Sequence, residues 1–84
     1  MSYELRFSPQ FRKDLQRLDS ALHRRILDAL GKLRDTPYQG RKLAGVGVGK
    51  WRIRIGDYRV RYDIERNVVL LYRVRKREDI YRRR

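Results

Sequence analysis

Apolar and polar positions follow a strand-like pattern at the start of the chain and then change to a helical one. Residues 3–7 alternate between apolar and charged side chains, which is typical of a strand with one buried face. Ser8 and Pro9 follow, a capping side chain and a proline that suits the first turn of a helix. The pattern predicts a strand over residues 3–7 and a helix that begins at Ser8-Pro9.

Two amphipathic helices are predicted after this strand. The first has about three turns and ends near Asp19-Ser20, and its apolar stripe is formed by Phe11, Leu15 and Leu18. The second begins at Asp19 or Ser20, and its apolar residues recur every three or four positions, at Leu22, Ile26, Leu30 and Leu33. Both stripes need a core to cover them, so we expect the helices to form a hairpin.

A long connection follows the second helix. Asp35-Thr36-Pro37 ends that helix, and the stretch up to Gly49 holds four glycines and little periodicity. We expect a loop, with room for one short irregular element. Residues 45–50 resemble a phosphate-binding glycine loop, but the spacing is one residue short and Trp51 stands where Ser or Thr should bind magnesium. We therefore reject a nucleotide-binding loop.

The second half of the chain changes to a period of two. Residues 50–55 and 58–65 alternate charged and apolar side chains on either side of Gly56-Asp57, which predicts a β-hairpin. Residues 68–72 are apolar at odd and even positions alike, as expected for a strand covered on both faces. We therefore place this fourth strand between the third and the first. The charged tail over 76–84 is predicted as a short helix or a loose end.

These elements predict an α+β fold in a single domain over residues 1–84. The helix hairpin packs on one face of a four-stranded, mainly antiparallel sheet, in the order β-α-α-β-β-β. At this length the chain has room for one small core and no second domain.

The hairpin register brings four arginines together on the face away from the core. If Gly56-Asp57 is a two-residue turn, Arg54 lies opposite Arg59 and Arg52 lies opposite Arg61, with side-chain bases roughly 5 Å apart. Like charges in such positions are destabilising, so either the long side chains splay into solvent or the patch binds an anion. The planar guanidinium fork grips phosphate with two donors, which favours phosphate as the ligand.

Composition and net charge limit the classes of partner that the protein can bind. The net charge is +13, the chain holds no cysteine, and hydrophobic residues make up 40% of it. Disulfides, thiolate zinc sites and a cysteine nucleophile are therefore excluded, and the charge predicts a polyanionic partner: nucleic acid, an anionic membrane or an acidic protein. No membrane partner is expected, because both helical stripes are needed for the core. The longest uncharged run, residues 43–49, cannot span a bilayer, and the N-terminus lacks a signal sequence, so we expect a cytoplasmic protein.

Other chemically active residues are few. His23 is the single histidine, so a paired-histidine ribonuclease mechanism is excluded. Asp63 and Glu65 lie on the predicted third strand without a second carboxylate pair, which argues against a two-metal nuclease. Trp51 and Tyr62 are interpreted as core residues rather than base-stacking platforms. We expect no metal and no cofactor.

Three stretches of the chain resemble the RelE/ParE superfamily of bacterial and archaeal toxins: KLAG at 42–45, WRIRIGDYRVRY at 51–62 and RVRKREDIY at 73–81. The likeness spans nearly the whole chain, and the part from 42 to 81 is the distinctive one. It implies a RelE-like fold and an acidic antitoxin, encoded nearby, that neutralises the toxin. By this likeness the protein is a monomer alone and a heteromer with its antitoxin.

The superfamily has two activities. The RelE branch cleaves messenger RNA in the ribosomal A site, whereas the ParE branch poisons DNA gyrase and lacks the nuclease residues. The nuclease positions are matched here by Arg52, Arg54, Arg59, Arg77 and Tyr81, which we expect to be catalytic. We expect further RNA contacts from Lys50, Arg61, Arg75 and Lys76. The likeness therefore implies a toxin that is a ribosome-dependent mRNA endonuclease and inhibits translation. The alternatives are a ParE-like gyrase inhibitor and a basic nucleic-acid-binding module without chemistry.

The implied reaction is metal-independent attack by the RNA 2′-OH, which needs a base, charge stabilisation and an acid. Tyr81 is the candidate base, with base stacking or cover for the sheet edge as its alternatives. Arg52, Arg54 and Arg59 hold and neutralise the phosphate, and Arg77 protonates the leaving oxygen. The chain has Arg where some relatives have Lys on the second strand, and a shorter interval between Arg77 and Tyr81. The likeness therefore carries over the arginine patch more directly than the acid and base roles.

Overall fold

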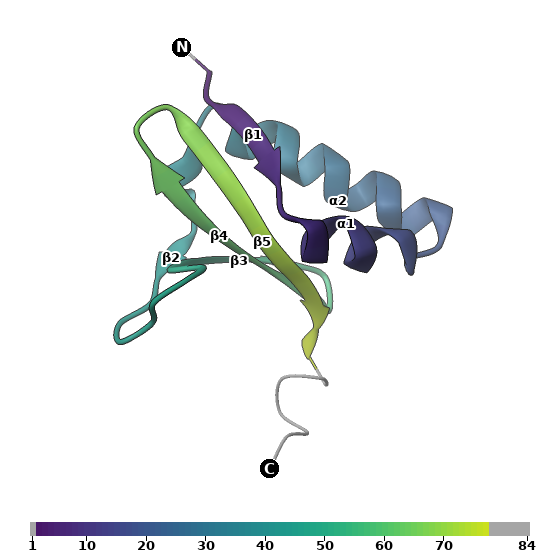
Figure 1. Cartoon of the computed structure of the whole chain (residues 1–84). Helices are drawn as coiled ribbons and strands as arrows, with labels where there is room; N and C mark the ends of the chain where they lie inside the picture. Colours follow the sequence, from purple (N-terminus) through teal and green to yellow (C-terminus); the bar gives the residue numbers. More distant parts are fainter. Residues whose placement is uncertain (1, 78–84) are drawn as a thin grey trace.

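Two helices lie against one face of a twisted five-stranded sheet (Figure 1). The computed structural model describes residues 2–77. In chain order the elements are β1 (Glu4–Phe7), α1 (Pro9–Gln16), α2 (Ser20–Leu33), the 3-10 helix η1 (Pro37–Gln39), β2 (Arg41–Lys42), β3 (Trp51–Ile55), β4 (Tyr58–Glu65) and β5 (Val68–Lys76). Helices α1 and α2 leave the other face of the sheet uncovered, so side chains on that face are available to form a site.

The strand order is β1-β5-β4-β3-β2, and β1 runs parallel to β5 while the other neighbours are antiparallel. The predicted place of the last strand, between the third and the first, is confirmed. The prediction of four strands is one short. Arg41 and Lys42 form an additional edge strand that pairs with Arg52 and Trp51. A strand of two exposed residues has no periodicity, so the pattern of the sequence could not reveal it.

The first helix is shorter than predicted. Ser8 caps it, because its Oγ accepts the Phe11 N–H at 3.0 Å, as the sequence indicates. The helix nevertheless ends at Gln16, where the Arg17 and Leu18 N–H groups bond to carbonyls three residues back. The chain therefore turns before Asp19.

The second helix matches its prediction closely. The Asp19 carboxylate accepts the Leu22 N–H at 2.8 Å and starts the helix at Ser20. Its predicted stripe faces the sheet, with Ile26, Leu30 and Leu33 buried. These residues join the core formed by Phe11, Leu15, Ile55, Val60, Tyr62, Val69, Leu71 and Val74. Among residues 2–77, no helix is long and apolar enough to cross a membrane.

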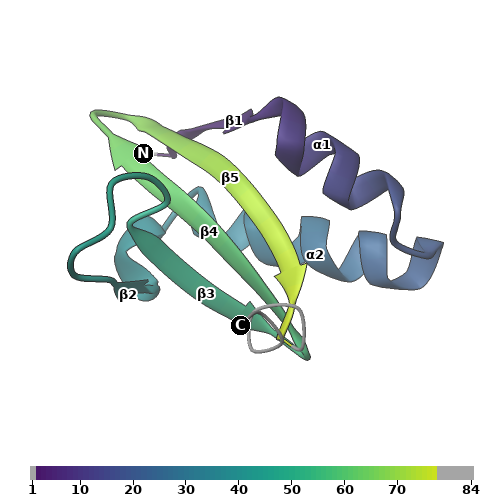
Figure 2. The same ribbon diagram turned by 60° about the horizontal axis from the view of Figure 1, so that its bottom comes forward.

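Helix α1 lies along the edge of β5 beyond the point where β1 ends (Figure 2). Strand β1 pairs with β5 only as far as Leu71, and Ser8 continues the ladder by donating its N–H to the Leu71 carbonyl at 3.0 Å. The Ser8 Oγ then donates to the Tyr72 carbonyl at 2.8 Å. Further along, the Asp14 carboxylate accepts the Val74 N–H at 3.0 Å. Polar groups of α1 and its cap thus satisfy an edge that β1 is too short to cover.

Candidate functional site

Arginines form two rows across the sheet face that the helices leave open. The first row runs over three strands, because Arg54 pairs with Arg59 and Arg59 pairs with Arg75. The second row runs over four strands and contains Arg41, Arg52, Arg61 and Arg73 in consecutive register. The rows are two residues apart along each strand, which is roughly 7 Å. We call these residues the arginine rows.

The predicted pairing of Arg54 with Arg59 and of Arg52 with Arg61 is confirmed. The face is not uniformly solvated, however. Arg54 and Arg75 are exposed, whereas Arg59, on the strand between them, is only 7% exposed. Neighbouring strands lie only 4.7–4.9 Å apart. Like charges in register are destabilising at such spacing, and a bound anion would offset that repulsion.

One end of the second row is turned away from the open face. The register slips between Arg61 and Tyr62, so β4 and β5 meet through a bulge. Beyond it, Arg73 directs its Nε to Asp14 Oδ2 at 2.9 Å and its Nη2 to Asp14 Oδ1 at 3.2 Å. The hydrogen bond to Asp14 raises the pKa of Arg73. Arg73 therefore braces α1 against β5 and does not contribute an open cation to the rows.

Arg61, predicted to bind RNA, uses its guanidinium to hold the glycine-rich loop between β2 and β3. Its Nε donates to the Gly49 carbonyl at 2.6 Å and its Nη2 donates to the Val48 carbonyl at 3.0 Å. Asp63 holds the same segment from the other side, accepting the N–H groups of Gly49 at 2.7 Å and Lys50 at 2.8 Å. The loop is thus fixed to β4 by one cation and one carboxylate.

Gly49 is required at this place. Its φ is +64°, and a Cβ there would lie 2.8 Å from the Tyr72 ring and 3.1 Å from the Arg61 Cβ. The loop leads into strand β3 and not into a helix, and a carboxylate occupies the N–H groups of Gly49 and Lys50. Both features are consistent with the rejection of a nucleotide-binding loop.

The remaining predicted site residues are placed differently from one another. Lys50 is exposed at the start of β3. Lys76 pairs in register with Tyr58, so its side chain alternates to the helix side, away from Arg75. Arg77 is exposed, and its N–H donates to the Asp57 carbonyl at 2.8 Å, next to the turn that joins β3 and β4. The predicted base, Tyr81, lies outside the described residues.

Sequence reasoning missed two residues of this surface. Arg41 joins the second row through the two-residue strand β2. Asp63 was weighed only as a metal ligand, yet it anchors the glycine-rich loop. The position of Asp63 on the outer parity of β4 was readable from the sequence, but its partners 13 and 14 residues away were not.

Trp51 and Tyr62, which the sequence pattern predicts as core residues, lie on the face of the sheet that packs against the helices. Tyr62 is fully buried and donates its hydroxyl to the Pro37 carbonyl at 2.8 Å. Burial raises the pKa of Tyr62 to about 12. Trp51 stacks on Tyr62 with ring centroids 6.3 Å apart and meets Tyr38 edge-on at 5.4 Å. His23 lies half-buried on α2, and within residues 2–77 no three acidic or histidine side chains come together as a metal site.

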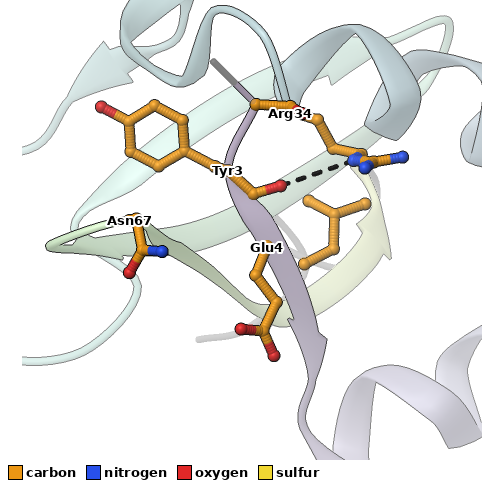
Figure 3. Close-up of a pocket in the computed structure, with 6 residues that line it drawn as sticks. Tyr3, Glu4, Arg34 and Asn67 are labelled. Carbon is orange, nitrogen blue, oxygen red and sulfur yellow. Dashed lines mark hydrogen bonds between the residues drawn. The ribbon is translucent and has the colours of Figure 1, made fainter.

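A surface hollow of about 470 Å³ lies where β1 begins and α2 ends (Figure 3). Tyr3, Glu4, Arg34 and Asn67 line it, and Arg34 Nε donates to the Tyr3 carbonyl at 3.4 Å. The hollow offers one cation beside one carboxylate and none of the residues in the arginine rows. The arginine rows are therefore the stronger candidate site.

Comparison with known proteins agrees with the fold. The ParE toxin family of the type II toxin-antitoxin system parDE matches residues 5–81. The chain is 36% identical to Toxin RelG of Mycobacterium tuberculosis over 87 residues, covering 99% of this chain and 100% of that one.

Solved structures give the same result. The toxin-antitoxin complex RelBE2 of Mycobacterium tuberculosis matches with a TM-score of 0.83 and 30% identity, over 92% of this chain and 100% of that one. The archaeal RelE-RelB complex of Pyrococcus horikoshii matches with a TM-score of 0.77 and 31% identity, over 92% and 97%. Sequence, fold and relatives together establish that the chain belongs to the RelE/ParE superfamily of toxins from type II toxin-antitoxin systems.

Proposed function

We propose that this toxin is a metal-independent endoribonuclease that cleaves messenger RNA in the ribosomal A site and so inhibits translation in the cytoplasm. The observation that carries the proposal is the pair of arginine rows on the open face of the sheet. Guanidinium groups in register can contact successive phosphates, and a fork donates two hydrogen bonds to each phosphate. The similarity to RelE-type toxins supports the same function.

The reaction breaks one P–O bond and forms another. The 2′-oxygen attacks the adjacent phosphorus, a base takes the 2′-OH proton, and an acid protonates the departing 5′-oxygen to leave a 2′,3′-cyclic phosphate. In this proposal Arg52, Arg54 and Arg59 stabilise the added negative charge on the phosphorane. Tyr81 is the base and Arg77 the acid.

We propose an acidic antitoxin as the second partner. The net charge of +13 makes a basic surface costly to bury against anything but acids. The RelBE2 structure is a toxin-antitoxin complex, and the Pyrococcus horikoshii structure is a RelE-RelB complex. The toxin is then a monomer alone and a heteromer in the neutralised state.

Gyrase inhibition is the second candidate, and the match to the ParE toxin family favours it. Incubating the protein with translating ribosomes and mapping new RNA ends separates the two functions. We expect cuts within codons that end in cyclic phosphate. Intact RNA together with gyrase-linked DNA breaks would establish the alternative. If neither RNA cleavage nor DNA breaks are observed, the remaining candidate is a basic nucleic-acid-binding module without chemistry.

The role of Tyr81 is tested in the same assay under single-turnover conditions. Tyr81→Phe keeps the ring and removes the hydroxyl, so a base role predicts that cleavage slows by about a hundredfold while ribosome binding stays unchanged. Cleavage at the wild-type rate by Tyr81→Phe, with loss in Tyr81→Ala, would instead make the tyrosine a stacking platform.

A further inference from the structure

An apolar hollow of about 350 Å³ adjoins the arginine rows on the open face of the sheet. Its lining includes Phe7 on β1, Leu70 and Tyr72 on β5, and Val48 on the glycine-rich loop. Val48 is 53% exposed at the edge of this hollow. An exposed apolar patch beside a charged surface commonly marks a binding site.

The walls of the hollow are held in place before any ligand binds. Arg6, Leu70 and Asp63 lie in register across β1, β5 and β4, and Asp63 ties down the loop that carries Val48. Arg61 holds the Val48 carbonyl itself at 3.0 Å. A preformed hollow with fixed walls is the usual form of a site for a small rigid group.

Along β4, the hollow lies next to the second arginine row. Asp63, at its edge, is two residues from Arg61, which is roughly 7 Å along the strand. One extended nucleotide spans such a distance. Arg52 lies opposite Arg61 on the next strand, about 5 Å further from the hollow. An RNA strand whose phosphate contacts Arg52 can therefore bring a base one or two nucleotides away to the hollow.

Charge and shape both favour a base as the occupant. The cations of the rows attract a phosphate backbone, while Val48, Leu70 and Tyr72 provide an apolar surface with an aromatic ring. Proteins that bind single-stranded RNA combine these two features, a basic track and platforms for unstacked bases. We propose that the hollow binds one unpaired base of the single-stranded RNA that crosses the arginine rows, an inference that rests on the RNA-cleaving function proposed above.

The test is a double-mutant cycle between Val48 and the base. Val48→Ser removes apolar surface at an exposed position and leaves the backbone contacts of the loop intact. Val46→Ser makes the same change in the same loop, at a residue that does not line the hollow. The probe is a short single-stranded RNA with 2′-O-methyl riboses, which cannot be cleaved by 2′-OH attack. A series of these RNAs lacks one base at a time.

We expect Val48→Ser to weaken binding about fivefold and Val46→Ser to leave it unchanged. The wild type should bind one of the abasic RNAs, the one that lacks the base held in the hollow, about fivefold more weakly than it binds the intact RNA. For that abasic RNA, Val48→Ser should weaken binding no further. Wild-type affinity of Val48→Ser for the intact RNA, or an equal loss at every abasic position, would overturn the proposal. Weakened binding of an acidic antitoxin alone would overturn it too, by making the hollow a protein-docking site.

Failure of the inference can be told apart from failure of the proposed function. If the wild type binds this RNA and Arg54→Ala weakens the binding, but Val48→Ser does not, only the base site is wrong. If the wild type shows no binding that depends on Arg54 and on salt, the base site is overturned, and the RNA function itself is decided by cleavage on translating ribosomes.

Discussion

The carboxylate of Asp14 on α1 binds Arg73 on β5 through two hydrogen bonds, of 2.9 and 3.2 Å, and it also accepts the Val74 N–H. The Asp14 side chain is 8% exposed and that of Arg73 is 30% exposed. One carboxylate therefore fastens the first helix to the strand edge and satisfies a backbone donor that no neighbouring strand reaches.

Asp14→Ala is expected to lower the free energy of unfolding by roughly 2–3 kcal/mol, because it leaves a partly buried cation and a buried N–H without a partner. Urea unfolding followed by circular dichroism measures the change. Glu4→Ala is the matched control, since the Glu4–Arg6 pair is exposed and should contribute less than about 0.5 kcal/mol. Equal losses in the two variants would contradict the assigned role of Asp14.

Asp63→Ala is expected to release the glycine-rich loop without unfolding the sheet. The amides of Gly49 and Lys50 then lose their acceptor, so their hydrogen exchange should quicken while that of Val69 in β5 stays slow. Glu65→Ala, on the same strand and exposed, serves as the control. Unchanged exchange at Gly49 would show that Asp63 does not hold the loop in solution.

Gly40 and Gly47 provide a matched pair of glycines. A Cβ at Gly40 would collide with the Tyr62 hydroxyl and lie 2.7 Å from the Arg52 carbonyl, whereas a Cβ at Gly47 meets nothing within 4 Å. Gly40→Ala should cost about 1–3 kcal/mol of stability and Gly47→Ala less than about 0.5 kcal/mol. Thermal unfolding of the two variants side by side decides whether η1 packs on Tyr62 this closely.

Stability should fall in strongly alkaline solution because of Tyr62. Its pKa is raised to about 12 in the folded protein, while an unfolded tyrosine loses its proton near pH 10.0. Between these values the unfolded chain binds fewer protons than the folded one, so the free energy of unfolding decreases as pH rises, by roughly 1 kcal/mol per pH unit. Below pH 10 this contribution is constant.

Tyr62→Phe is the comparison for the alkaline effect. It should cost roughly 1 kcal/mol at neutral pH through the lost hydrogen bond to Pro37, and it should flatten the decline between pH 10 and 12. Denaturant unfolding at a series of pH values gives both quantities. A decline of equal slope in wild type and variant would assign the alkaline loss to other groups.

Arg54→Ala is expected to weaken binding of single-stranded RNA and to reduce the slope of log affinity against log salt by about one, because one phosphate contact is lost. Arg24→Ala removes the same charge from the exposed side of α2, on the far side of the sheet, and should leave the slope unchanged. Titrations at several salt concentrations measure both. Equal effects of the two variants would mean that net charge, and not the arginine rows, governs binding.

Much of this fold is readable from local patterns. The period-two alternation on both sides of Gly56-Asp57 set the hairpin register, and the structure pairs Arg54 with Arg59 as expected. The apolar residues at both parities of β5 placed it inside the sheet, where it lies between β1 and β4. Such patterns work because a strand or helix repeats its geometry along the chain, so burial of one face leaves a regular trace in the sequence.

The sequence by itself determined the two helices, the order of the four main strands and the opposed arginines of the hairpin. Only the tertiary structure decided that Arg41 extends the second row, that Asp63 and Arg61 hold the glycine-rich loop, and that Arg73 turns to Asp14. These features depend on a two-residue strand, a loop folded back over the sheet and a bulge at the β4–β5 pairing. None of them repeats along the chain, so each becomes visible only when distant segments meet in space.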